Sequence, residues 1–222
     1  MGMIIDPYRF GVPDAIISLT DQSSSTTNSG TYTFSGMNFG AASSDRYIVV
    51  AVGAGIGSFG GGVSISSVTI GGVGATIVRQ QAANVSGSGA LSGIAIAAVP
   101  SGASGNVVVT LGASHQNCAI TVYAVTGLLS AAAAYTNSAT GASPSSSIDC
   151  DAGGVVIAAA TGRNTGGTTT WTGLTEASDF SLESLTIISS ADSPFASAQS
   201  SLAVQASFSA STGGSICIAA FR

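Results

Sequence analysis

The chain has 222 residues, of which 45% are hydrophobic, so it is long enough to bury a sizeable core. Only 7% of its residues are charged, there is no lysine, and the net charge is −5. Disorder requires low hydrophobicity with high charge, and nucleic-acid binding requires clustered basic residues, so this composition argues against both. Gly and Ser interrupt every apolar stretch before it reaches membrane-spanning length, so we expect no membrane segment.

The first twenty residues form a segment of their own, which we expect to be an extended attachment arm. Two prolines interrupt it, and it lacks the positive and apolar regions of a secretory signal. Its candidate partner-binding residues are Ile5, Pro7, Tyr8, Arg9 and Phe10. The alternative is an N-terminal strand that folds onto its own domain. Residues 21–30 are polar and are predicted to be a linker.

The remaining chain predicts short strands separated by turns. The continuous apolar runs 47–52, 154–160 and 216–221 are typical of strands buried on both faces. Further strands are expected at 31–34, 65–70, 75–79, 91–99, 107–111, 118–125, 129–135, 168–171, 182–188 and 202–208. The pair Gly71-Gly72 predicts a hairpin turn. This spacing indicates an all-β protein, an antiparallel β-sandwich of jelly-roll or immunoglobulin-like type.

The two halves of the chain, residues 21–128 and 129–222, match loosely. VTIGGVGAT in the first half matches TTWTGLTEA in the second, and each half closes on an apolar strand that contains a cysteine. We therefore predict an internal duplication. Two tandem sandwiches and one interleaved sandwich both fit this pattern. Because no linker longer than a turn separates the halves, we expect one body.

Two motifs suggest chemistry but have a simpler interpretation. Residues 55–60 fit the dinucleotide-binding pattern G-x-G-x-x-G, yet a strand rather than a helix is expected after them. We interpret residues 53–62 as a long loop. The only histidine, His115, lies in a predicted turn, and no nucleophile motif G-x-S-x-G occurs. We expect a solvated histidine and no cofactor.

The best candidates for a pair of catalytic carboxylates are Glu176 with Asp179 or with Glu183, near Trp171. A glycosidase would need two such groups beside a sugar-binding aromatic ring. Surface charges that keep an acidic protein in solution explain the same residues more simply. We therefore predict no catalytic residues.

The three cysteines, Cys118, Cys150 and Cys217, lack the spacing of a zinc site or a disulfide framework. We expect small buried thiols. Cys150 lies on a predicted turn between Asp149 and Asp151, which makes it the best candidate for a crosslink between subunits. The two aspartates could also bind calcium, but we predict no metal site.

The predicted strands lack the usual protection of sheet edges. Natural sheets guard their edges with lysines, inward charges or prolines, and this chain has no lysine and five prolines. We infer that a neighbouring copy or a host surface covers at least one edge, and that the N-terminal arm takes part.

Much of the chain resembles β-sandwich proteins encoded in the structural modules of tailed bacteriophages. The resemblance lies in TYTFSGMNFGAASSDRYIVVAV, SSVTIGGVGATIV, AAVPSGASGNVVVTLGASHQNCAITVYAVTGL and SSSIDCDAGGVVIAAATG. The opening MIIDPYRFG also resembles the N-terminal arms of virion proteins. The resemblance rests on strand and turn residues. It implies a virion component of the head, neck or tail, and it supplies no catalytic residues.

We therefore predict a non-enzymatic virion structural protein, made in the host cytoplasm. It would be a capsid decoration protein, head spike or tail-fibre subunit that binds other virion proteins and copies of itself as a homo-oligomer. The alternative is a receptor- or carbohydrate-binding module, in which Trp171, Tyr135 or Phe59 stacks on a host-surface glycan. A hydrolase of surface polysaccharide is the weakest of the three hypotheses.

Overall fold

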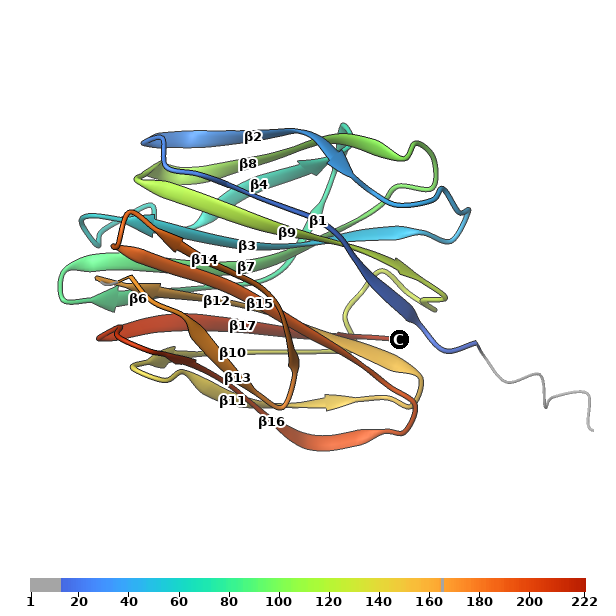
Figure 1. Cartoon of the computed structure of the whole chain (residues 1–222). Helices are drawn as coiled ribbons and strands as arrows, with labels where there is room; N and C mark the ends of the chain where they lie inside the picture. Colours follow the sequence, from blue (N-terminus) through green and yellow to red (C-terminus); the bar gives the residue numbers. More distant parts are fainter. Residues whose placement is uncertain (1–12, 165) are drawn as a thin grey trace, which may run out of the picture.

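A computed structural model describes residues 13–164 and 166–222, in which all regular structure is β-strand. The strands form antiparallel sheets that lie in four layers (Figure 1). The predicted all-β, antiparallel sandwich is therefore confirmed, while the jelly-roll or immunoglobulin-like type stays a prediction.

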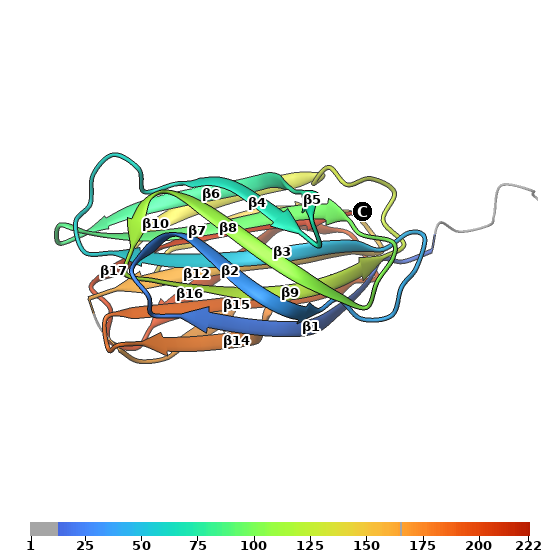
Figure 2. The ribbon, with the colours of Figure 1, turned by 90° about the horizontal axis from the view of Figure 1, so that it is seen from above.

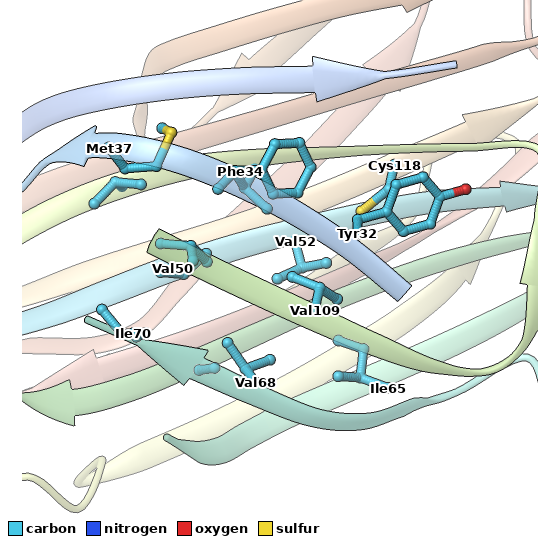
Figure 3. Packing of buried hydrophobic residues seen from close by; sticks show 14 of the residues in the cluster. Tyr32, Phe34, Met37, Val50, Val52, Ile65, Val68, Ile70, Val109 and Cys118 are labelled. Atoms are coloured by element: carbon cyan, nitrogen blue, oxygen red, sulfur yellow. The ribbon is translucent and has the colours of Figure 1, made fainter. Parts of the chain in front are cut away.

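The first half of the chain forms two of the four layers. The outer sheet has, in spatial order, β2 (Ser29–Asn38), β8 (Ser104–His115), β4 (Ile65–Ile70) and β5 (Val73–Gly74). The inner sheet has β1 (Ile16–Ser25), β9 (Asn117–Thr126), β3 (Tyr47–Ile56), β7 (Ser88–Ala98) and β6 (Thr76–Val85). Their facing sides enclose a core that includes Tyr32, Phe34, Val50, Ile70 and Val109 (Figure 3).

The second half forms the other two layers. The inner sheet has β10 (Tyr135–Gly141), β17 (Gly213–Phe221), β12 (Gly154–Arg163), β15 (Thr186–Phe195) and β14 (Thr175–Leu182). The outer sheet has β11 (Ser145–Cys150), β16 (Gln199–Phe208) and β13 (Thr169–Thr172). Apart from β5, the two halves arrange their strands in the same spatial order. Each half is thus a sandwich of its own, and the sequence duplication stays a prediction.

The two inner sheets pack against each other and join the sandwiches. A third apolar cluster lies between them, with Val49 and Ile96 on one side and Ile157 and Phe221 on the other. Hydroxyl groups continue this contact, since Ser92 Oγ lies 2.9 Å from Ser215 Oγ, and the two are hydrogen bonded. β3 is therefore buried on both faces, as the continuous apolar run 47–52 predicted.

Glycines allow the inner sheets to approach closely. A Cβ at Gly53 would overlap Ile188, and one at Gly55 would lie 2.9 Å from Arg163 Nη1. Both residues belong to β3, so the predicted loop 53–62 is wrong for its first four residues. The Gly71-Gly72 hairpin is confirmed, with φ values of +60° and +83° that suit a two-residue turn.

Four predicted boundaries are wrong, and one of them is the predicted strand 182–188, which contains a turn at residues 183–185 between β14 and β15. β1 begins at Ile16, so residues 16–20 are strand rather than arm, and the predicted linker 21–30 lies largely in β1 and β2. Residues 21–25 pair with β9 as part of the edge strand β1. Residues 129–134 are a loop, and β10 follows them. β10, β11 and β14 were not predicted, because small polar residues dominate these edge strands.

Candidate functional site

The predicted partner-binding residues Ile5, Pro7, Tyr8, Arg9 and Phe10 lie outside the described residues, but the place where the chain enters the body is described. The Pro13 carbonyl accepts a hydrogen bond from Arg222 Nη1 (2.8 Å). The Ala15 N–H donates to the Gly153 carbonyl (2.8 Å). Both ends of the described chain therefore lie at one end of the molecule, here called the terminal pole (Figure 1).

The terminal pole joins both sandwiches to the entering chain. Ala15 leads into β1 of the first sandwich, whereas Gly153 and Arg222 flank strands of the second. Gly153 has a φ of +73°, and a Cβ there would lie 2.8 Å from the guanidinium carbon of Arg222. A hollow of about 200 Å³ beside it is lined by residues such as Asp14, Gly153 and Phe195.

The opposite ends of β3 and β12 hold a buried polar cluster, which we call the distal pole and define by His115, Asn117 and Arg163. His115 is fully buried at the end of β8, so its prediction as a solvated turn residue is wrong. Its Nδ1 lies 2.8 Å from the Ala113 carbonyl, and burial lowers the pKa of the imidazole. The ring is therefore neutral near pH 7, with the proton on Nδ1.

The distal pole is incompletely hydrogen bonded. Four buried side-chain atoms have no partner among the described residues, and all belong to this cluster: His115 Nε2, Asn117 Nδ2, Asn117 Oδ1 and Arg163 Nε. The Arg163 guanidinium donates hydrogen bonds to Gln116 Oε1 and Thr186 Oγ1. It forms no ion pair with a carboxylate of the described residues. Because these atoms are enclosed, a substrate cannot reach them in this conformation.

The structure separates one of the two predicted carboxylate pairs. Glu176 lies near the start of β14, and Glu183 follows the end of that strand, about 23 Å away at the rise of an extended chain. A glycosidase needs its two carboxyl groups within about 10 Å. Glu176 and Asp179 remain neighbours, and burial together with Asp179 raises the pKa of Glu176.

The remaining members of that candidate site have structural partners. Asp179 accepts hydrogen bonds from the Thr169 N–H (2.9 Å) and hydroxyl (3.2 Å). Trp171 packs against the core of the second sandwich, and its Nε1 donates to Ser189 Oγ (2.8 Å). The indole is therefore partly buried, and its N–H has a structural partner.

Tyr135 is the predicted aromatic residue that borders a groove. Tyr135 is 39% exposed, and the groove, of about 250 Å³, lies between β10 and β11. Asn137 Nδ2 donates to the Ser147 carbonyl (2.7 Å) in this groove, and Asp149 Oδ1 accepts from the Ser201 N–H (2.7 Å). An exposed ring beside a carboxylate and amides is chemically suited to hydroxylated ligands. Phe59 is also exposed, but on a loop.

The three cysteines are buried free thiols, as predicted. The same burial corrects the interpretation of Cys150, which is not displayed on a turn for crosslinking. Burial raises the pKa of its thiol to about 11. Asp149 and Asp151 do not form part of any group of three or more metal-ligating side chains within the described ranges.

Most edge strands of the described sheets carry β-bulges. Register shifts occur where β1, β2, β4, β6, β11 and β14 pair with their neighbours. The central pairs of β3 with β7 and of β12 with β15 have none. Bulges twist an edge away from the geometry that another strand needs. Sequence reasoning missed this device because a bulge leaves no charged residue as a signal.

No protein-family model and no curated protein matches this chain. The described part of the chain also contains no helix that could span a membrane.

Proposed function

We propose that the protein is a non-enzymatic structural subunit of a tailed-phage particle, such as a capsid decoration protein, head spike or fibre subunit. The virion assignment rests on the sequence resemblance. The mode of attachment rests on the terminal pole, where the entering segment continues into β1 of the first sandwich and is hydrogen bonded to Gly153 and Arg222 of the second. An arm attached there transmits force directly to the body.

The test removes residues 2–12, because a deletion up to residue 20 would also remove half of β1. We expect the shortened protein to keep its β-sheet circular dichroism and unfolding midpoint but to lose binding to particles that lack this chain. The matched control is a full-length chain with Phe59→Ser, which changes an exposed loop residue beyond the end of β3 that lies away from the terminal pole. Undiminished binding after the deletion would mean that the sandwiches, and not residues 2–12, attach the protein to the particle.

The second candidate function is a carbohydrate-binding module, and the groove beside Tyr135 favours it. In that case a glycan array should show saturable, sugar-specific binding that Tyr135→Ala abolishes and Asp149→Asn weakens. Phe59→Ala serves as the control, because Phe59 is also exposed but lies outside the groove.

A further inference from the structure

We propose that β10 is a contact between two copies of this chain, which pair antiparallel, edge to edge, about a two-fold axis through Ser138. This deepens the proposed role as an assembly subunit by naming the surface through which copies associate. β10 is the edge strand of the inner sheet of the second sandwich, and β6 of the first sandwich lies next to it on one long side of the molecule (Figure 2).

β10 is the unprotected edge among the described strands. The other edge strands either carry a register shift or, like β5 and β13, have four residues or fewer. β10 pairs with β17 over seven residues without a shift. Its sequence, YTNSATG, contains no charge and no proline. A regular, uncharged edge is the geometry that templates the addition of another strand.

The outward backbone groups of β10 identify the residues that would pair. The Ser138 N–H donates to the Asn137 side-chain oxygen (2.9 Å), so it is not used for pairing with β17. Because neighbouring residues of a strand direct their N–H and C=O groups to opposite sides, Thr136 and Thr140 also direct theirs outward. The Asn137 side chain thus occupies the position that a carbonyl of an added strand would take.

These outward groups are self-complementary. A two-fold axis at Ser138 pairs it with Ser138 of the second copy, and pairs Thr136 with Thr140 of that copy. Residue pairs of this kind exchange two backbone hydrogen bonds, and Thr–Thr pairs across strands are favourable. The same register sets Tyr135 opposite Gly141 of the second copy. A Cβ at Gly141 would meet no atom within 4 Å, so space for the ring is open there.

One charge opposes the contact. Arg79 of β6 lies over the proposed axis, since its Nη2 donates to Ser138 Oγ (2.6 Å). The two-fold axis therefore brings the two Arg79 side chains near each other, and both copies are net negative. We expect salt to strengthen association by screening this repulsion. Arg79→Gln should strengthen it as well.

The first test measures association by sedimentation velocity from about 1 to about 200 µM, a range that detects micromolar dimers. We expect a concentration-dependent dimer that Ser138→Pro weakens at least about tenfold, because proline removes an outward N–H but no bond to β17. Ser138→Ala is the matched control. It keeps the N–H and loses only the hydroxyl contacts to Arg79 and Gln81, so it should still dimerise.

The second test does not depend on the proline variant folding. In the proposed register the two Ser138 Cα atoms lie about 5.5 Å apart, which a disulfide can bridge. Mild oxidation of Ser138→Cys should therefore give a covalent dimer. Thr172→Cys, on the short edge strand β13, should not, and the three native cysteines are buried and silent.

A chain that stays monomeric throughout the range overturns the proposal. The proposal is also overturned if the Ser138→Pro variant, shown to be folded by circular dichroism, still dimerises and the Ser138→Cys variant fails to crosslink. Either result leaves the arm-deletion test standing, because a monomer can still bind the particle through residues 2–12. Conversely, undiminished particle binding by an arm-deleted chain that still dimerises would contradict the proposed attachment and leave the β10 contact standing.

Discussion

Each pole of the molecule buries an arginine that forms no ion pair with a carboxylate of the described residues, and the two arginines differ in their hydrogen bonds. At the terminal pole, Arg46 is 1% exposed and its guanidinium is hydrogen bonded on all three nitrogens. Its acceptors are the backbone carbonyls of Val99, Phe39, Gly40, Ala41, Ser101 and Gly102. At the distal pole, Arg163 is 2% exposed, and its Nε has no partner among the described residues.

This difference shows how a chain with few charges uses them. Burying a cation is costly unless each of its N–H groups donates a hydrogen bond. Arg46 meets that requirement with backbone carbonyls from two loops, one before β3 and one after β7. It therefore fixes the loops before β3 and after β7 in one arrangement. Arg163 meets the requirement in part. The buried arginine of the terminal pole is thus fully hydrogen bonded, whereas the distal pole keeps unused hydrogen-bonding capacity.

The largest expected effect is the difference in free energy of unfolding between variants of the two buried arginines. Arg46→Met leaves several buried carbonyls without a donor and should lower the free energy of unfolding by about 4 kcal/mol. Arg163→Met removes a cation that is poorly compensated, so its cost should be about 1 kcal/mol or less. Guanidinium denaturation of both variants measures this. Equal losses would mean that the two poles are equally well satisfied.

A smaller effect is expected where the sandwiches meet. Gly53→Ala places a methyl group against Ile188 and Thr161, and overpacking of this kind should cost about 2 kcal/mol. Gly60→Ala is the control from the same glycine run, because a Cβ there meets no atom within 4 Å. Its effect should stay within about 0.5 kcal/mol. If the two variants unfold alike, the close approach of the inner sheets contributes little to stability.

Burial and the sequence separation of contacts decide which parts of the structure could be predicted from sequence. The strand at 47–52 was predictable because burial on both faces leaves a continuous apolar run. β10 was not, because an exposed edge strand of small polar residues resembles a loop. His115 was wrongly predicted to be exposed to solvent, because Arg163 and its neighbours from the other half of the chain cover the turn that follows β8. Such coverage depends on contacts far apart in sequence.

The smallest effect concerns pH and separates the distal pole from the rest of the molecule. Burial holds the pKa of His115 below its usual 6.5, so the folded state binds fewer protons than the unfolded state just below that value. Stability is therefore lost as pH falls through 6.5. Asp192 acts in the opposite sense, because burial raises the pKa of its carboxyl from 3.8 to about 6, and its folded form gains stability as pH falls through that window.

The two contributions can be separated with single variants. His115→Gln should flatten the acid-side loss in a plot of unfolding free energy against pH, while Asp192→Asn should steepen it between pH 6 and 3.8. Asp192→Asn should also stabilise the protein above pH 6, by about 1 kcal/mol once its partial exposure to solvent is considered. A pH profile that His115→Gln leaves unchanged would show that folding does not lower the pKa of the imidazole.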